Sequence, residues 1–245
     1  MIKNGYAEKL IIKYSDIDQN LALKPFAILN FLQDIASKNA EDLGFGYSYI
    51  HEKNYAWFLI KYHMEFSEYP EDIGELTLIT EPRGYNKLFA YRDFEFLKNN
   101  KNIARISSMW SIVDVKSRTM VPINNVFINN EKMIPYTKKQ DDLSFEKIPT
   151  IQNIHLSKEF NIRYNDIDVN GHANNGNYII WALEPLDFEF RCSKKIKTVD
   201  MIFKKESKYN EKIISEVEIL DELTTIHRLT NQDNEEIYSM KCHWT

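Results

Sequence analysis

The chain has 245 residues, of which 43% are hydrophobic and 27% charged, a composition typical of a globular protein with a substantial core. Its net charge of −5 argues against a general nucleic-acid binder, and no run approaches the roughly 18 apolar residues that a membrane-spanning helix needs. The start of the chain lacks a secretory hydrophobic segment, and Cys192 and Cys242 make neither a disulfide framework nor a metal-ligand spacing. We therefore expect a cytoplasmic protein that uses no metal or cofactor and does not insert into membranes.

The first half of the chain is predicted to form a strand, a helix and then four strands. Apolar residues recur at helical spacing, with Pro25 near the start of the run and Gly44 after its end. The predicted strands are rich in β-branched and aromatic residues. They cover Ala7–Tyr14, Tyr55–Phe66, Gly74–Arg83, Leu88–Leu97 and Ile103–Val115, with an exposed hairpin loop at Lys98–Asn102.

A polar segment separates the two halves. Between about Asn124 and Leu156 the pattern gives way to Asn, Lys and Asp, together with two prolines. Such a composition is typical of an inter-domain connector. We expect an N-terminal domain at 1–130, a linker at 131–155 and a C-terminal domain at 156–245.

The second half repeats the plan of the first. A helix is predicted over Asn174–Phe190, and its run Tyr178–Leu183 is apolar nearly all round, which indicates a buried helix. Strands are predicted at Ser157–Arg163, Lys197–Phe203, Lys212–Leu220, Thr224–Thr230 and Glu236–Trp244.

An internal repeat links the two halves. The segment 14–22 aligns with 164–172 at a constant offset, without a gap. Asp18 and Asn20 of the earlier copy recur in the later one, but Ala22 stands where the later copy has a histidine. The chain thus carries two similar halves, and only the second has the complete polar set.

A second repeat and the order of elements predict the architecture. Met64–Phe66 aligns with Met201–Phe203, at a shorter offset than the first repeat. One helix followed by antiparallel strands, twice, predicts an α+β protein in which the sheet of each half wraps its own central helix. The two sheets are expected to pair through their edges, because pairing satisfies backbone groups that would otherwise be exposed.

The polar set of the later copy predicts a hydrolytic site. Asp168, Asn170 and His172 recur at every second position, so in an extended segment their side chains share one face. The alternative is an Asx-rich turn with a surface histidine. Asn174 and Asn175 follow, and their side chains can cap the buried helix by accepting from its first backbone amides.

The sequence resembles the acyl-acyl carrier protein thioesterases of plants and bacteria, a tandem hotdog family. In the second half the resemblance rests on the motif D-x-N-x-H-x-N-N-x-x-Y-x-x-W-x-x-E, which runs from Asp168 to Glu184. In the first half it rests on Trp57, on Tyr69-Pro70 followed by Gly74, and on Ser108-Met-Trp110 leading to Arg118. The resemblance implies a double hotdog, each half a long central helix wrapped by an antiparallel sheet, with an acyl-chain pocket in the first half.

The resemblance also implies which residues are catalytic. They are the aspartate, asparagine and histidine of the motif and a glutamate in a stretch of the form aromatic-basic-basic-Glu-Cys. That stretch is Phe203-Lys-Lys-Glu206-Ser207 here, so Glu206 matches the glutamate while Ser207 replaces the cysteine. A thiolate nucleophile is thus missing at this position, so either the reaction needs none or the protein is impaired, and we expect the former. Without the resemblance, Glu206 would be assigned as a surface glutamate among lysines.

Residue chemistry suggests a role for each group. Glu206 is expected to act as general base on a water molecule, with His172 sharing the proton or hydrogen-bonding the water or the carbonyl, and the sequence leaves this division open. Asn170 suits the orientation of water or substrate, and Asp168 would orient Asn170. Backbone amides at Asn174–Asn175 are expected to stabilise the oxyanion.

A basic stretch suggests a partner. The residues 191–212 include eight basic side chains and three acidic ones, in a chain that is negative overall. Lys194, Lys195 and Lys197 are expected to attract an acidic acyl carrier protein, and the alternative is a solvated strand face.

We expect a thioester hydrolase that releases free fatty acid from acyl-acyl carrier protein. The alternatives are an acyl-CoA thioesterase of the same fold and a non-catalytic module that binds acyl carriers. A homodimer is one option for its assembly.

Overall fold

The computed structural model describes residues 5–71, 75–127 and 130–245 of the chain. Within the first half these residues form β1 (Tyr6–Leu10), η1 (Tyr14–Asp16), α1 (Pro25–Asp42), α2 (Tyr47–Glu52), β2 (Tyr55–Phe66), β3 (Leu76–Tyr85), β4 (Ala90–Lys98), β5 (Lys101–Asp114), β6 (Met120–Val121) and α3 (Ile123–Val126). The predicted helix and the four strands that follow it are confirmed, and their ends lie close to the predicted ones. Gly74, predicted to start a strand, lies outside the described residues.

The end of the first strand and the hairpin loop at 98–102 differ from prediction, each for a local reason. The first strand ends at Leu10 and not at Tyr14, because Asp16 folds the chain into a 3₁₀ turn by accepting the Lys13 N–H at 2.8 Å. The predicted hairpin loop at 98–102 shortens to two asparagines. Both have left-handed φ angles, 51° and 63°, as a tight type I′ hairpin turn requires.

Within the second half the described residues form β7 (Leu156–Asn161), η2 (Tyr164–Asp166), α4 (Asn175–Leu183), α5 (Phe188–Ser193), β8 (Ile196–Phe203), β9 (Lys212–Asp221), β10 (Thr224–Asn231) and β11 (Glu236–Trp244). The strands agree with prediction, but the single helix predicted over Asn174–Phe190 is wrong. Pro185 has no N–H to continue the helix and its ring would clash with the preceding turn, so α4 ends at Leu183.

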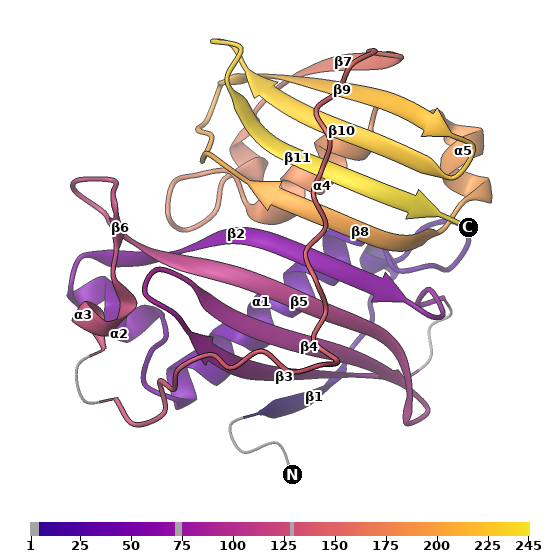
Figure 1. Ribbon diagram of the computed structural model, residues 1–245. Coiled ribbons are helices and arrows are strands. Elements are labelled where there is room, and N and C mark those ends of the chain that lie inside the picture. The colour runs from indigo at the N-terminus through magenta and orange to yellow at the C-terminus, as the bar shows by residue number, and fades with distance from the viewer. Residues whose placement is uncertain (1–4, 72–74, 128–129) are drawn as a thin grey trace.

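The described strands join one antiparallel sheet, in the order β1-β3-β4-β5-β2-β8-β11-β10-β9-β7, with β6 paired to β5. The two halves meet where β2 lies antiparallel to β8 (Figure 1), which confirms the predicted pairing of sheet edges. His63 stands directly opposite Asp200, which is also its counterpart in the second sequence repeat. The two copies are therefore related by a local two-fold axis through this seam.

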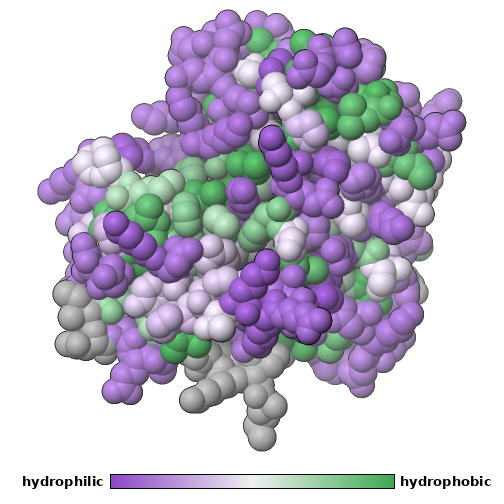
Figure 2. Space-filling model, in the orientation of Figure 1, coloured by the Kyte–Doolittle hydropathy of each residue, from purple (hydrophilic) through white to green (hydrophobic). Residues whose placement is uncertain are grey.

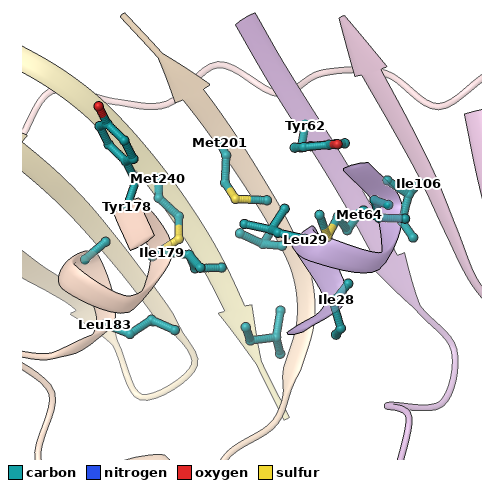
Figure 3. Packing of buried hydrophobic residues seen from close by; sticks show 14 of the residues in the cluster. Ile28, Leu29, Tyr62, Met64, Ile106, Tyr178, Ile179, Leu183, Met201 and Met240 are labelled. Atoms are coloured by element: carbon teal, nitrogen blue, oxygen red, sulfur yellow. The ribbon is translucent and has the colours of Figure 1, made fainter. Parts of the chain in front are cut away.

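Both long helices lie on one face of the sheet. In Figure 1, α1 and α4 lie behind the strands, and a single core of buried side chains runs through both halves. Figure 3 shows Leu29 of α1 close to Met201 of β8, and Ile179 of α4 beside Met240 of β11. The apolar sides of both helices are thus buried by one curled sheet, as the hotdog plan requires.

The segment 131–155 crosses the opposite face of the sheet (Figure 1) and contains no helix or strand. It is nevertheless bound to the sheet. Asp142 makes an ion pair with Arg83 at 2.7 Å, Tyr136 stacks on a tyrosine of β4 with 4.2 Å between ring centroids, and the Glu146 N–H donates to Asp200 at 2.9 Å. Figure 2 shows its polar surface beside an apolar area over β2 and β5.

Candidate active site

The residues 168–172 form a tight turn, so the expectation of an extended segment is wrong. The Asp168 N–H donates to the His172 carbonyl at 2.8 Å, and the Gly171 N–H donates back to the Asp168 carbonyl at 3.1 Å. Gly171 has a φ of 78°, a left-handed angle that glycine adopts without strain. Asp168 Oδ1 also accepts the Asn170 N–H at 2.8 Å. The alternative Asx turn is therefore confirmed for the backbone, while the histidine side chain is only 14% exposed.

The first half contains the same turn without the histidine. Asp18 Oδ1 accepts the N–H groups of Asn20 and Ala22 at 2.8 and 3.0 Å, and the Asp18 N–H donates to the Ala22 carbonyl at 2.8 Å. The aspartate is thus retained where no catalytic histidine exists. In the second half, Asp168 contacts the turn and the Asn170 amide, at 3.3 Å, which fits a residue that shapes the turn.

The helix that follows begins as predicted. Asn174 is the N-cap of α4, and its side chain accepts the Gly176 N–H at 2.8 Å. Because this oxygen is engaged in capping, the Asn174 side chain is not directed to substrate. Asn175 begins the helix and lines the pocket described below.

Glu206 and His172 come together at the head of α4. The Ala173 N–H donates to the Ser207 carbonyl at 2.8 Å and so holds the turn against the chain that leaves β8. Glu206 Oε2 then lies 3.4 Å from His172 Nε2. His172 Nδ1 is buried and has no hydrogen-bond partner among the described residues. A carboxylate and an imidazole at this distance can exchange or share a proton through a small shift.

The equivalent place in the first half is filled by a phenol. The same backbone bond recurs there, since the Leu23 N–H donates to the Pro70 carbonyl at 2.8 Å. Tyr69 therefore stands where the second half has Glu206, and Ala22 stands where it has the histidine. The Tyr69 hydroxyl donates to the Leu23 carbonyl at 2.8 Å. At these two positions the first half therefore has neither a carboxylate nor an imidazole.

Arg118 is the site residue that residue chemistry missed. It lies in the turn between β5 and β6, far from Glu206 in the sequence. Its Nη1 donates to Glu206 Oε2 at 2.8 Å, and its Nη2 lies 3.2 Å from His172 Nε2. The sequence signal was its place in the family motif of the first half, which named no role for it.

A pocket of about 80 Å³ opens at these groups and is built by both halves. From the second half it is lined by the motif residues Asp168, Asn170, His172 and Asn175, with Tyr178, Lys205 and Glu206. From the first half it is lined by Gln33 of α1, Trp57 and Leu59 of β2 and Trp110 of β5. Two of the first-half residues that carry the family resemblance, both tryptophans, thus face the same space as the acid–base pair.

The lining of this pocket contains no serine or cysteine from the described part of the chain. Ser207, which replaces the family cysteine, is fully buried and does not line the pocket. Cys242 is buried within β11, where burial raises the pKa of its thiol, and Cys192 lies in α5 against Gln19. Within the described part of the chain, the pocket therefore offers neither a thiol nor a serine hydroxyl as a nucleophile.

The three lysines expected to bind a partner do not lie at the pocket. Lys194, Lys195 and Lys197 are at the start of β8, while Glu206 follows its end, so about 25 Å of strand separates them. Lys195 pairs with Glu71 at 3.1 Å. Lys205, in contrast, lines the pocket itself.

Neither a metal centre nor a membrane-spanning helix is found in the described residues. No group of three or more His, Cys, Asp or Glu side chains among them is arranged to hold a metal ion. In the same part of the chain, no helix is both long and apolar enough to cross a membrane.

The fold and the site define a double hotdog protein with a carboxylate and an imidazole side by side at the head of α4. The sequence profile of the acyl-ACP thioesterase N-terminal domain matches residues 3–130, and that of the C-terminal domain matches residues 149–245. The chain belongs to the acyl-ACP thioesterase family.

Known relatives agree with this assignment. The chain is 24% identical to oleoyl-acyl carrier protein thioesterase 2, chloroplastic, of Arabidopsis thaliana over 241 residues, which cover 90% of this chain and 63% of the relative. It is 23% identical to a palmitoyl-acyl carrier protein thioesterase, chloroplastic, of the same plant over 220 residues, which cover 82% and 52%. The chain thus spans less than two thirds of the length of these relatives.

Solved structures share the fold along the whole chain. An acyl-ACP thioesterase from Bacteroides thetaiotaomicron superposes with a TM-score of 0.87 at 21% identity, covering 99% of this chain and 98% of the other. A 12:0-ACP thioesterase from Umbellularia californica superposes with a TM-score of 0.84 at 16% identity, covering 99% and 97%. These likenesses show the tandem hotdog fold.

Proposed function

We propose that the protein is a thioester hydrolase that releases free fatty acid from acyl-acyl carrier protein. The observation that carries this proposal is the approach of Glu206 Oε2 to His172 Nε2, at 3.4 Å, in a pocket at the head of α4. Membership of the acyl-ACP thioesterase family supports the choice of thioester and carrier.

The reaction is a direct attack by water. Glu206 takes a proton from a water molecule in the pocket, and the water oxygen forms a bond to the thioester carbonyl carbon. The tetrahedral intermediate then breaks its C–S bond, and the proton held by Glu206 passes to the departing sulfur. The products are a fatty acid, which loses its proton to solvent, and the free thiol of the carrier. His172 either shares the proton taken by Glu206 or hydrogen-bonds the water or the carbonyl.

The turn and the helix start provide the polar groups around this step. Asn170 orients water or substrate from the tip of the turn that Asp168 shapes. The backbone amide of Asn175 lies at the positive end of α4, where a developing oxyanion is stabilised. This assignment is supported by the position of Asn175 in the lining of the pocket. The Asn174 N–H, which was expected to contribute, donates to the Asp166 carbonyl at 2.8 Å and is not free to do so.

The acyl chain is proposed to extend into the first half. A space of about 80 Å³ accommodates a thioester group but not a long hydrocarbon chain. Trp57 lines this space and also packs against a second apolar cluster. There its ring stacks on that of Phe127, with 5.9 Å between the ring centroids. On this view, residues 1–130 are the domain that holds the acyl chain, 131–155 the linker and 156–245 the domain that carries the catalytic motif.

The remaining assignments concern partner and setting. We assign an acyl carrier protein as the partner, attracted by Lys194, Lys195 and Lys197 along β8 toward the pocket. No nucleic acid or membrane is involved, the setting is the cytoplasm, and a homodimer stays an option.

Hydrolysis of matched acyl-carrier and acyl-CoA thioesters tests the proposal. We expect turnover of the carrier thioester by the wild type and a loss of about 10²–10⁴ in kcat for Glu206→Ala and His172→Ala. Changing Lys194, Lys195 and Lys197 to glutamate should raise KM for the carrier substrate only. Preference for the CoA substrate would favour an acyl-CoA thioesterase, and binding without turnover of either would favour a non-catalytic module.

A further inference from the structure

Arg118 comes from the first half of the chain and contacts both acid–base groups of the second. Its Nη1 lies 2.8 Å from Glu206 Oε2, and its Nη2 lies 3.2 Å from His172 Nε2. The same two atoms of Glu206 and His172 are 3.4 Å apart. One guanidinium therefore bridges the carboxylate and the imidazole at the place where the two come closest.

The backbone around Arg118 is built to present the side chain there. Asp114 Oδ1 accepts the N–H groups of Lys116 and Ser117 at 2.9 and 2.7 Å, and the Arg118 N–H donates to the Asp114 carbonyl at 2.9 Å. Arg118 itself has a left-handed φ of 57°, which is uncommon for a residue with a side chain. A turn fixed by three such bonds supports one direction for the arginine.

These contacts assign a different role to each nitrogen and oxygen atom of the site. A guanidinium only donates, so the lone pair of His172 Nε2 accepts from Arg118 Nη2 when the imidazole carries its proton on Nδ1. Glu206 Oε2 accepts from Arg118 Nη1. Glu206 Oε1 makes no hydrogen bond or ion pair with any residue that the structure describes. Glu206 lines the pocket and Arg118 does not.

We propose that Arg118 is a positioning residue, which holds Glu206 Oε2 and His172 Nε2 so that Oε1 of Glu206 is the base that activates water. This inference rests on the proposed function and assigns the division of labour that the sequence leaves open between the glutamate and the histidine. It also makes the active site a joint product of both halves, since neither half alone contains the arginine and the acid–base pair.

The contribution of this ion pair to folding stability is too small to explain why Arg118 is placed here. The Arg118 side chain is 50% exposed and Glu206 is 36% exposed, and ion pairs of that kind contribute little to folding. Arg191 and Glu184 form a closely matched pair elsewhere, at 3.2 Å, with exposures of 40% and 37%. The chain therefore provides its own control for the loss of an exposed arginine–glutamate bridge.

The test compares Arg118→Ala, Arg118→Lys and Arg191→Ala with a small acyl thioester, whose hydrolysis does not depend on docking of a carrier protein. We expect kcat to fall about 100-fold in Arg118→Ala with KM changed less than about threefold, and to remain at the wild-type level in Arg191→Ala. Arg118→Lys should recover part of the loss, because an ammonium supplies charge but cannot bridge two acceptors in one plane.

Two readouts separate positioning from a structural effect. Added methylguanidinium should restore part of the activity of Arg118→Ala and leave Arg191→Ala unchanged. Combining Arg118→Ala with Glu206→Gln should cost no more than Glu206→Gln alone, since the arginine acts through the glutamate.

The outcomes distinguish this inference from the proposed function. A wild-type protein without thioester turnover would overturn the function and the inference together. If Glu206→Gln is inactive while Arg118→Ala keeps wild-type kcat, the function stands and the role of Arg118 is rejected. A loss in Arg118→Ala that is not rescued by methylguanidinium and adds fully to Glu206→Gln would likewise reject it.

Discussion

Asp168 and Asp18 make the same backbone contacts in the two copies of the turn, which allows their roles to be separated by experiment. Each accepts two N–H groups of its turn. We expect Asp168→Ala and Asp18→Ala to lower the free energy of unfolding by similar amounts, about 1–2 kcal/mol, because each removes acceptors for two backbone donors. Only Asp168→Ala should also lower kcat, since only its turn carries a histidine.

Urea unfolding and steady-state kinetics on the two variants test this prediction. A drop in kcat for Asp18→Ala as large as that for Asp168→Ala would show that the turn of the first half is needed for catalysis. Full activity in Asp168→Ala would show that the turn does not position His172.

The residues of the site differ in how far sequence could predict them. Asp168, Asn170 and His172 were found because they are close in the chain, but their period of two fits a strand and an Asx turn equally well, and the turn is what forms. Glu206 was found only through a family resemblance, since its surroundings are those of a surface glutamate. Arg118 reaches Glu206 from the other half of the chain, and no local pattern predicts a contact of that kind.

At the scale of elements, the contact between α1 and α4 depends on the absence of a side chain. A Cβ built on Gly176 would lie 2.8 Å from the ring of Phe26 and 3.1 Å from the Asn30 side-chain oxygen. Alanine favours a helix over glycine by about 1 kcal/mol, but a crowded packing contact costs about 1–3 kcal/mol. Gly176→Ala should therefore destabilise the protein.

Thermal or urea unfolding of Gly176→Ala, Phe26→Ala and the double variant measures this. Removing the ring should relieve the clash, so the double variant should be more stable than the sum of the single effects predicts. Additive losses would mean that Phe26 moves aside at no cost and that the crowding argument fails.

The ends of a helix or strand were predicted correctly where a single sequence signal determines them. Tyr55–Phe66 and Glu236–Trp244 begin and end where predicted, because apolar and aromatic side chains recur along each strand and polar residues flank it. The helix predicted over Asn174–Phe190 ends before Pro185. The apolar pattern continues past this proline, but proline lacks the N–H that a continuing helix needs. The short helix α2 was missed because so few residues give too little periodicity to recognise.

At the scale of the whole molecule, a buried histidine–aspartate pair sits at the seam of the sheet. His63 Nδ1 lies 2.9 Å from Asp200 Oδ1, and its Nε2 lies 3.2 Å from Glu65. Burial by itself lowers the pKa of His63, but the hydrogen bonds and charges of Asp200 and Glu65 outweigh it and raise the pKa above 6.5. The folded protein therefore binds this proton more tightly than the unfolded chain does.

This raised pKa predicts a pH-dependent seam. The stability that protonated His63 contributes is fully present below pH 6.5 and is lost as the pH rises through the raised pKa. The difference in free energy of unfolding between the wild type and His63→Gln should therefore be larger at about pH 6 than at about pH 9. Urea titrations at both pH values measure it, and equal differences would mean that His63 is not charged in the folded protein.

Tyr69 occupies the position that Glu206 has in the second half. This difference between the two copies is possible because both are part of one chain. In a dimer of identical subunits, every substitution occurs in both copies of the site. One site therefore cannot be inactivated while the other is kept. A chain that holds both copies is free of that constraint. Here the first half carries a phenol at the position of the carboxylate, so it is free to take on the acyl-holding role proposed above, while its Arg118 still contacts Glu206 and His172 of the second half.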